Sequence, residues 1–142
     1  MKDQSGCVFC KIVKGELFVA KLHEDDEVMA FVDIMPVNPG HSLVIPKKHA
    51  KLVAELSEKT FARLFEVGRK LQAKIAKAFP ETTAFNLFIA DGEDAGQEVP
   101  HVHLHVLPRK PNDGFGIRFG PDYGKILSEE ERKNIAKRIL SA

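Results

Sequence analysis

Three histidines occupy alternate positions in the stretch PHVHLHVLPR, residues 100–109, and this alternation constrains the fold more than any other feature of the chain. A period of two is typical of a β-strand, in which residues i, i+2 and i+4 share one face, about 6.6 Å apart. One face of the predicted strand carries His101, His103 and His105. The opposite face carries Val102, Leu104 and Val106, which we expect to pack into a core.

Four further segments have the composition of strands. Residues 16–23 and 27–34 predict two strands joined by an acidic turn, and residues 42–46 (SLVIP) predict a third after the loop MPVNPG. A fourth is expected at residues 84–90, followed by the loop DGEDAGQEV and then the histidine strand. Pro100 suits only the first residue of that strand, and Pro108 is expected to end it.

Two helices are predicted from capping signals. Ser57 is suited to cap a helix that runs to about Phe79, where Pro80 stops it. Its apolar stripe would consist of Phe61, Leu64, Phe65, Leu71, Ile75 and Ala78. The sequence SEEE at residues 128–131 is a capping box for a last helix, whose inner face would carry Ile135 and Ile139. Strands in succession with one inserted helix predict an α+β fold with an antiparallel sheet of about five strands.

Size and charge exclude several classes of function. A chain of 142 residues is expected to form a single domain over residues 1–142, and it needs no disulfide to support its core. The formal net charge of +1 provides no basis for binding nucleic acid or a membrane surface. No apolar run approaches the roughly 18 residues of a membrane span, and the start MKDQSGCVFCK has no apolar signal segment. We therefore expect a cytoplasmic protein.

The histidine strand allows three interpretations. A solvated polar face is the simplest, but half of the six histidines fall within five residues, which chance placement rarely produces. A His-x-His pair can bind zinc through both imidazoles, as in metal-dependent hydrolases. Alternatively, the middle imidazole is a nucleophile that its neighbours position, because neutral imidazole has one lone pair for attack.

The only two cysteines form the pattern Cys7-x-x-Cys10. This pattern is half of a zinc site, a redox pair or two buried thiols, and the spacing alone does not choose among them. A thioredoxin-like redox motif would need a βαβ context, which is absent from the predicted elements.

The run His101-Val102-His103-Leu104-His105-Val106-Leu107 resembles the signature of the histidine triad (HIT) family of nucleotidyl hydrolases and transferases. The segments FVDIMPVNPGHSLVIPKKH (31–49) and DGEDAGQEV (91–99) also resemble that family, in its order and spacing. The resemblance implies a HIT-like core at about residues 7–109, followed by a C-terminal loop and helix at 110–142. It also implies a homodimer in which two sheets join.

The resemblance implies roles for single histidines. His103 is similar to the family nucleophile, which attacks the α-phosphate and forms a covalent nucleotidyl-imidazole that water then cleaves. The carbonyl of the first histidine, here His101, holds the second ring nitrogen of that nucleophile. His105 and His41 resemble the flanking histidines that contact phosphate oxygens and stabilise charge as the leaving group departs.

The remaining nucleotide contacts are also implied by resemblance. Asp33 is similar to the residue that accepts the ribose hydroxyls, and Gln97 to a loop glutamine that reaches the phosphates. Apolar residues for the core or the base pocket are Val8, Phe9, Ile12, Phe31 and Ile34. Two positions depart from the family pattern: Ala90 stands where many members have Asn or Gln, and Glu98 where many have Ser or Thr. A carboxylate near phosphates is repulsive unless it turns outward.

Some HIT proteins pair such a CxxC with two histidines, and the matching positions are His49 and His101. The resemblance thus implies a structural zinc held by Cys7, Cys10, His49 and His101, with no organic cofactor. The expected partners are small-molecule purine nucleotide derivatives. The leading function is cleavage of a nucleoside phosphoramidate or a dinucleoside polyphosphate to a nucleoside monophosphate. The alternatives are a hydrolase with zinc-activated water held by the triad, and a nucleotide-binding scaffold with weak turnover.

Overall fold

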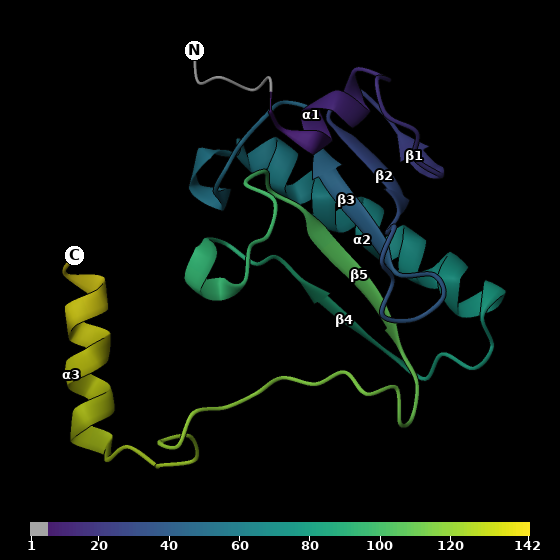
Figure 1. Cartoon of the computed structure of the whole chain (residues 1–142). Helices are drawn as coiled ribbons and strands as arrows, with labels where there is room; N and C mark the ends of the chain where they lie inside the picture. Colours follow the sequence, from purple (N-terminus) through teal and green to yellow (C-terminus); the bar gives the residue numbers. More distant parts are fainter. Residues whose placement is uncertain (1–5) are drawn as a thin grey trace.

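A five-stranded antiparallel sheet forms the centre of the computed structural model, which describes residues 6–142 (Figure 1). Its strands are β1 (Lys21–Glu24), β2 (Val28–Val32), β3 (Ser42–Pro46), β4 (Ala84–Phe88) and β5 (Leu104–Arg109). They lie in the order β1-β2-β3-β5-β4, and every neighbouring pair is antiparallel. The predicted α+β class is confirmed, although β1 is shorter than the segment 16–23 and β4 ends before residue 90.

Three α-helices and two short 3-10 turns accompany the sheet within residues 6–142. They are α1 (Val8–Val13), η1 (Val53–Glu55), α2 (Glu58–Ala78), η2 (Glu93–Ala95) and α3 (Glu129–Leu140). Ser57 caps α2 by accepting a hydrogen bond from the Thr60 amide, as its position before the apolar run predicts. The six-residue helix α1 was not predicted, because so short a segment carries little periodicity.

Alternation along the strands divides the core into two layers. Val28, Ala30, Val44, Leu104 and Val106 pack with the buried side of α2. Their neighbours on the opposite face pack with Phe9 and Ile12 of α1, and they are Met29, Phe31, Leu43 and Ile45. Because successive side chains of a strand point to opposite faces, the α1 face is also the face of His103 and His105.

The histidine segment differs from the prediction at both ends. Strand β5 begins at Leu104, so His101 and His103 precede it, and it contains Pro108 opposite Phe85. The pairing of β5 with β3 stops at Val44–Leu104. Two residues further along β3 is Pro46, which has no N–H to donate to the segment before β5. Pro108 is tolerated because its N and C=O point to the side of β3, which begins only at Ser42 opposite Val106, so no ladder hydrogen bond is lost there. Its carbonyl accepts from the Asn38 side chain instead.

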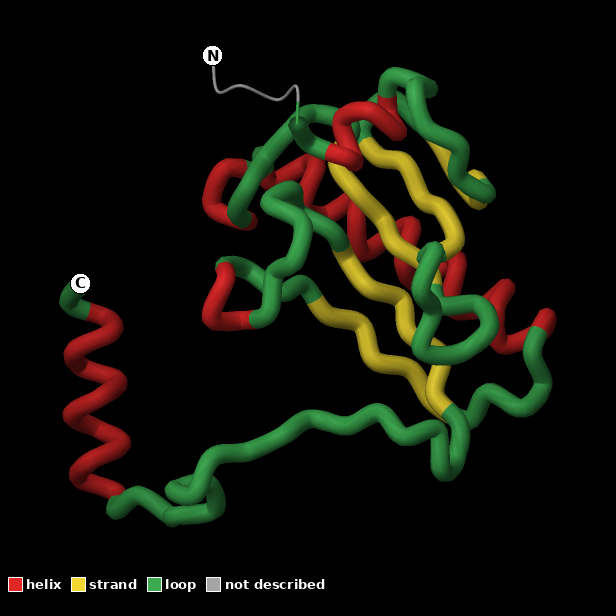
Figure 2. The backbone as a smooth tube through the Cα atoms, viewed as in Figure 1, coloured by secondary structure: helices red, strands yellow, loops and turns green. Residues whose placement is uncertain are grey.

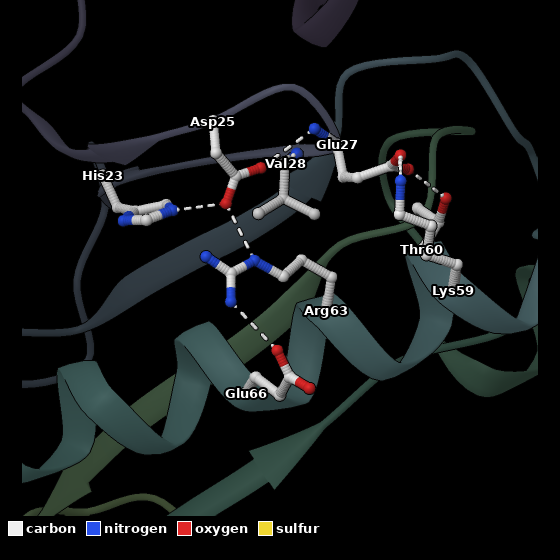
Figure 3. A network of polar contacts seen from close by, with 8 residues as sticks. All are labelled: His23, Asp25, Glu27, Val28, Lys59, Thr60, Arg63 and Glu66. Carbon is white, nitrogen blue, oxygen red and sulfur yellow. Dashed lines mark hydrogen bonds and ion pairs between the residues drawn. The ribbon is translucent and has the colours of Figure 1, made fainter.

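The acidic turn between β1 and β2 is tied to α2 through Asp25 (Figure 3). The Asp25 carboxylate accepts hydrogen bonds from the amides of Glu27 and Val28, from His23 Nε2 and from Arg63 Nε of α2. Burial alone would raise the pKa of Asp25, but these donors bring it well below its ordinary value. The network fixes the hairpin against the helix.

The buried stripe of α2 shares Leu64, Leu71 and Ile75 with the predicted one and adds Val67 and Gly68. Phe61 and Phe65 are instead about 40% exposed, with ring centroids 5.3 Å apart, and Ala78 is exposed. Gly68 faces the chain's own β5, where an added Cβ would lie 2.8 Å from Leu104 Cδ2.

The C-terminal segment lies apart from the sheet (Figure 2). The capping box at Ser128 and Glu131 is present, as predicted. No residue of α3 is buried, so the prediction that Ile135 and Ile139 form an inner face is wrong for this chain on its own. Residues 116–142 are all exposed, because the loop after β5 leads away from the body. Among residues 6–142, no helix combines the length and apolar character that crossing a membrane requires.

Candidate active site

A pocket of about 570 Å³ opens on the face of the sheet opposite α2. Its floor is made by Phe9, Phe31 and Leu43, which are all buried, and its rim carries Phe18, Ile34 and Met35, which are largely exposed. Ile12 and Val8 also line it. The apolar residues proposed for the core or the base pocket thus lie in one cavity, whose volume is typical of small-molecule sites.

His103 lies at the polar end of this pocket with one nitrogen committed. Its Nδ1 is 2.8 Å from the carbonyl oxygen of His101. A carbonyl only accepts, so Nδ1 carries the proton and, in the neutral ring, Nε2 carries the lone pair. The side chain is buried, with 5% exposed, and it lines the pocket. The arrangement leaves one nucleophilic atom in a fixed ring.

The hydrogen bonds of His41 and His105 fix their tautomers as well. The Val37 amide donates to His41 Nδ1 at 3.2 Å, so neutral His41 carries its proton on Nε2. That nitrogen lies 3.0 Å from His105 Nδ1, which therefore accepts. The remaining nitrogen of neutral His105, Nε2, then carries a proton. The site combines a lone pair on His103 with an N–H on His105.

Burial keeps these two histidines neutral. It lowers the pKa of His105 to about 4, with further lowering from His103 and His41. Burial also lowers the pKa of His41, and the nearby Asp33 opposes this shift. At pH 7 both rings are neutral, so they act as hydrogen-bond donors and not as fixed cations.

Phe88 stacks on His105 and was not identified from the sequence. The two ring centroids are 4.4 Å apart at an interplanar angle of 10°. Strand pairing explains the contact, because Phe88 of β4 lies directly opposite His105 of β5. The signal was present in the apolar alternation of residues 84–88, but the register between two strands cannot be read from either strand alone.

Asp33 lies beside the histidines at the end of β2. Its Oδ1 accepts from the Met35 amide at 2.9 Å, and its Oδ2 is 3.6 Å from His41 Nε2. The side chain is 15% exposed and lines the pocket. The Asp33 carboxylate therefore lines the cavity with hydrogen-bonding capacity left, as a ribose contact requires.

The loop of residues 91–99 places its two candidate residues differently. Gln97 Oε1 accepts from the Gly92 amide at 3.0 Å and Nε2 donates to the Lys51 carbonyl at 2.8 Å. In this conformation the side chain braces the loop, and the phosphate contact expected of Gln97 stays a prediction. Glu98 lines the pocket, whereas the buried Ala90 does not. The departure at Glu98 is therefore the one that changes the cavity.

A second cluster joins Cys7, Cys10, His49 and His101. Cys7 Sγ lies 3.4 Å from His101 Nδ1, Cys10 Sγ lies 3.2 Å from His49 Nδ1, and the two Nδ1 atoms are 3.2 Å apart. Tetrahedral zinc with bonds of about 2.0–2.3 Å places its ligand atoms about 3.3–3.8 Å apart. His101 Nε2 donates to the Pro46 carbonyl at 2.9 Å, which leaves Nδ1 for a metal. The donor set fits zinc.

The three triad histidines do not converge on one point. His101 turns toward the cysteines and His103 is held by the carbonyl of His101. His105 groups with Asp33 and His41, but the Val37 amide occupies His41 Nδ1, so a metal at Nε2 would need an imidazolate. This geometry does not favour a zinc-activated water held by the triad.

Comparison with known proteins gives consistent matches. Residues 14–112 match the family model described as HIT domain. The chain is 41% identical over 136 residues to the Schizosaccharomyces pombe protein named adenosine 5'-monophosphoramidase hnt1, over 95% of this chain and 96% of that protein. A HIT family protein from Bacillus anthracis shares the fold with a TM-score of 0.87 and 39% identity, over 96% of both chains. A Zn-bound histidine triad family protein from Mycobacterium smegmatis matches with a TM-score of 0.71 and 32% identity, over 98% of this chain and 99% of that one.

Proposed function

This chain belongs to the HIT family, and from that premise we propose that it hydrolyses nucleoside phosphoramidates at the α-phosphate through a covalent intermediate on His103. The observation that carries the proposal is the hydrogen bond between His103 Nδ1 and the His101 carbonyl. It presents the lone pair of Nε2 to a pocket large enough for a nucleotide.

The reaction has two steps. The lone pair of His103 Nε2 attacks the α-phosphorus, and the phosphorus–nitrogen bond breaks with its electron pair on the leaving nitrogen, which takes a proton from water. Water then attacks the phosphorus and releases a proton, and the pair of the phosphorus–imidazole bond returns to His103. The His105 Nε2–H donates to the phosphate oxygens in both steps, and His41 holds His105 in that tautomer.

The charges of the pocket favour a phosphoramidate over a dinucleoside polyphosphate. Among the described residues that line it, the charged groups are Asp33 and Glu98, and no lysine or arginine is present. A polyphosphate leaving group carries several negative charges that need cationic partners. An amine leaving group does not, and the name of the S. pombe relative supports the same class of bond.

The nucleoside is proposed to occupy the apolar part of the cavity. Phe31 and Ile34, with Phe9 beneath them, offer a surface for a purine ring, and Asp33 Oδ2 accepts from the ribose hydroxyls. His105 and Gln97 complete the proposed nucleotide contacts. The proposed purine preference is supported by the name of the S. pombe relative, an adenosine 5'-monophosphoramidase.

We propose that zinc is a structural component held by Cys7, Cys10, His49 and His101. The four converging ligand atoms and the Zn-bound M. smegmatis relative support this assignment. When bound, the metal would supply cross-linking of α1 to the segment before β5, and it would stiffen the backbone whose carbonyl orients His103.

We also propose a homodimer. Exposed apolar side chains on three elements support it, and they include Phe61 and Phe65 on α2, Leu87 on β4, and Ile135 and Ile139 on α3. Side chains of this kind are removed from water when a second copy covers them.

Turnover of adenosine 5'-phosphoramidate tests the proposed function. The wild-type protein is expected to release AMP and ammonia, whereas His103→Ala is expected to lose at least about a thousandfold in kcat/KM, as covalent nucleophiles typically do. His23→Ala is the matched control, because His23 lies outside both clusters and pairs with Asp25. Absence of AMP release by the wild type, or activity in His103→Ala near the wild-type value, would contradict the proposal.

A further inference from the structure

The carboxylate of Glu98 lines the pocket without a partner. Among the described residues it forms no hydrogen bond or ion pair, whereas the other pocket carboxylate, Asp33, accepts from the Met35 amide and lies beside His41. Most of the remaining lining is apolar. Glu98 is exposed to solvent while it lines the pocket, so its unpaired carboxylate is accessible to a cationic group of a ligand.

The other parts of the pocket already have occupants under the proposed function, on which this inference rests. The apolar walls suit the base, Asp33 suits the ribose, and His103 and His105 suit the phosphate. Glu98 is the one charged group of the described lining left for the rest of the substrate, which is the leaving amine. Its position two residues before Pro100 places it on the loop that leads into His101 and His103.

We propose that Glu98 makes this site select leaving amines that carry a positive charge away from the reacting nitrogen, such as diamines or basic amino acids. The negative phosphate enters a pocket that already holds two carboxylates and no lysine or arginine among its described lining. An ammonium on the leaving group offsets that repulsion. At a separation of about 6 Å, the attraction changes kcat/KM by roughly 3- to 100-fold between limits set by solvent screening.

A panel of three adenosine 5'-phosphoramidates tests this selection. Their leaving amines are putrescine, n-butylamine and γ-aminobutyrate, which have similar lengths and end in a cation, a methyl group and an anion. For the wild type, kcat/KM is expected to fall in that order, by about tenfold or more across the panel at low salt. Raising the ionic strength is expected to reduce the differences in kcat/KM among the three compounds, because salt screens the charge of Glu98.

The variant Glu98→Gln keeps the shape of the side chain and removes its charge. For this variant, the kcat/KM values of the three compounds are expected to lie within about twofold of one another. Because the three values are compared within one protein, a general loss of activity cancels. Glu93→Gln is the matched control, since Glu93 lies on the same loop outside the pocket lining. It is expected to keep the wild-type order.

Three results would overturn the proposal in distinguishable ways. A flat order in the wild type would show that the pocket does not sense the charge of the leaving group. An unchanged order in Glu98→Gln would show that another group senses it. No turnover of any of the three compounds would overturn the phosphoramidase function itself, and this inference with it.

Discussion

His105 is enclosed by three rings, and this enclosure sets its chemistry. Phe88 stacks on it, His41 hydrogen-bonds to it, and the centroid of the His103 ring is 4.9 Å away. The roles expected of His103 and His41 come from the resemblance of their surrounding segments to the HIT family, which can be read from the sequence. The contribution of Phe88 and of the Val37 amide cannot be read from it, because both depend on how separate segments meet in space.

The lowered pKa of His105 predicts a loss of stability in acid. Its folded-state pKa of about 4 lies below the ordinary value of 6.5. As the pH falls below 6.5 the unfolded chain takes up a proton that the folded chain does not, so stability falls until about pH 4 and then levels. The groups facing His105 are His103 and His41, with Asp33 beyond His41. Asp25 and Asp113 have lowered pKa values and contribute only below that window.

Urea unfolding at several pH values measures this effect. Between pH 6.5 and 4, His105→Asn is expected to lose less stability than the wild type, by up to about 1.4 kcal/mol per pH unit. Comparing the two proteins cancels the contributions of the other histidines. Parallel curves for the two proteins would show that His105 is not the group responsible.

At the scale of elements, capping predicted α2 and α3, and alternation predicted the five strands but not all of their limits. The limits of α2 and β3 follow from Ser57, Pro80 and the apolar run 42–46. The start of β5 could not be predicted, because it depends on Pro46 in the partner strand. Gly68, in the middle of α2, is explained by its approach to Leu104 of the same chain.

The variant Gly68→Ala tests this close packing. Alanine improves helix propensity by about 1 kcal/mol, but its Cβ would lie 2.8 Å from Leu104 Cδ2, and overpacking of this kind costs about 1–3 kcal/mol. Leu104 is fully buried, so it cannot move freely. We expect a net loss of about 1 kcal/mol by chemical denaturation, with lower activity because Leu104 follows His103. The control Arg69→Ala, at an exposed position of α2, is expected to stay within about 0.5 kcal/mol of the wild type. A Gly68→Ala protein at least as stable as the wild type would refute the packing argument.

At the scale of the whole molecule, two features reach beyond the sheet. The Cys7–Cys10–His49–His101 cluster joins segments that are far apart in the chain, and α3 extends from the body with no buried residue. The family resemblance implied the cluster, and the capping box predicted the helix. The sequence could not predict that α3 does not pack on the sheet of its own chain, because an apolar stripe does not determine which surface covers it.

The zinc assignment predicts one metal ion per chain. The double variant Cys7→Ser, Cys10→Ser is expected to lose the ion and to melt about 5 °C or more below the wild type, because binding to the folded state contributes free energy of folding. Turnover below the melting point is expected to fall only modestly. Atomic absorption and calorimetry measure both effects, and a chelator that destabilises the wild type should leave the variant unchanged. A wild type without zinc, or a variant as stable as the wild type, would contradict the assignment.

The exposed C-terminal segment predicts that dimerisation depends on it. Removing residues 116–142 is expected to weaken association by at least tenfold in dissociation constant, because Ile135, Ile139 and their neighbours would lose contact with the second copy. Sedimentation equilibrium over a range of concentrations measures this change. A full-length protein that stays monomeric, or a truncated one that associates equally well, would rule out this role.

The covalent step on His103 is the central claim, and trapping the intermediate tests it most directly. Wild-type protein is mixed with adenosine 5'-phosphoramidate, quenched within one turnover without acid, and analysed by peptide mass spectrometry. The account predicts one adenylyl group on the peptide that contains His103, acid-labile as expected for a phosphorus–imidazole bond, and none in His103→Ala. An adduct on another residue, or an active wild type whose His103→Ala variant turns over at a similar rate, would contradict the account.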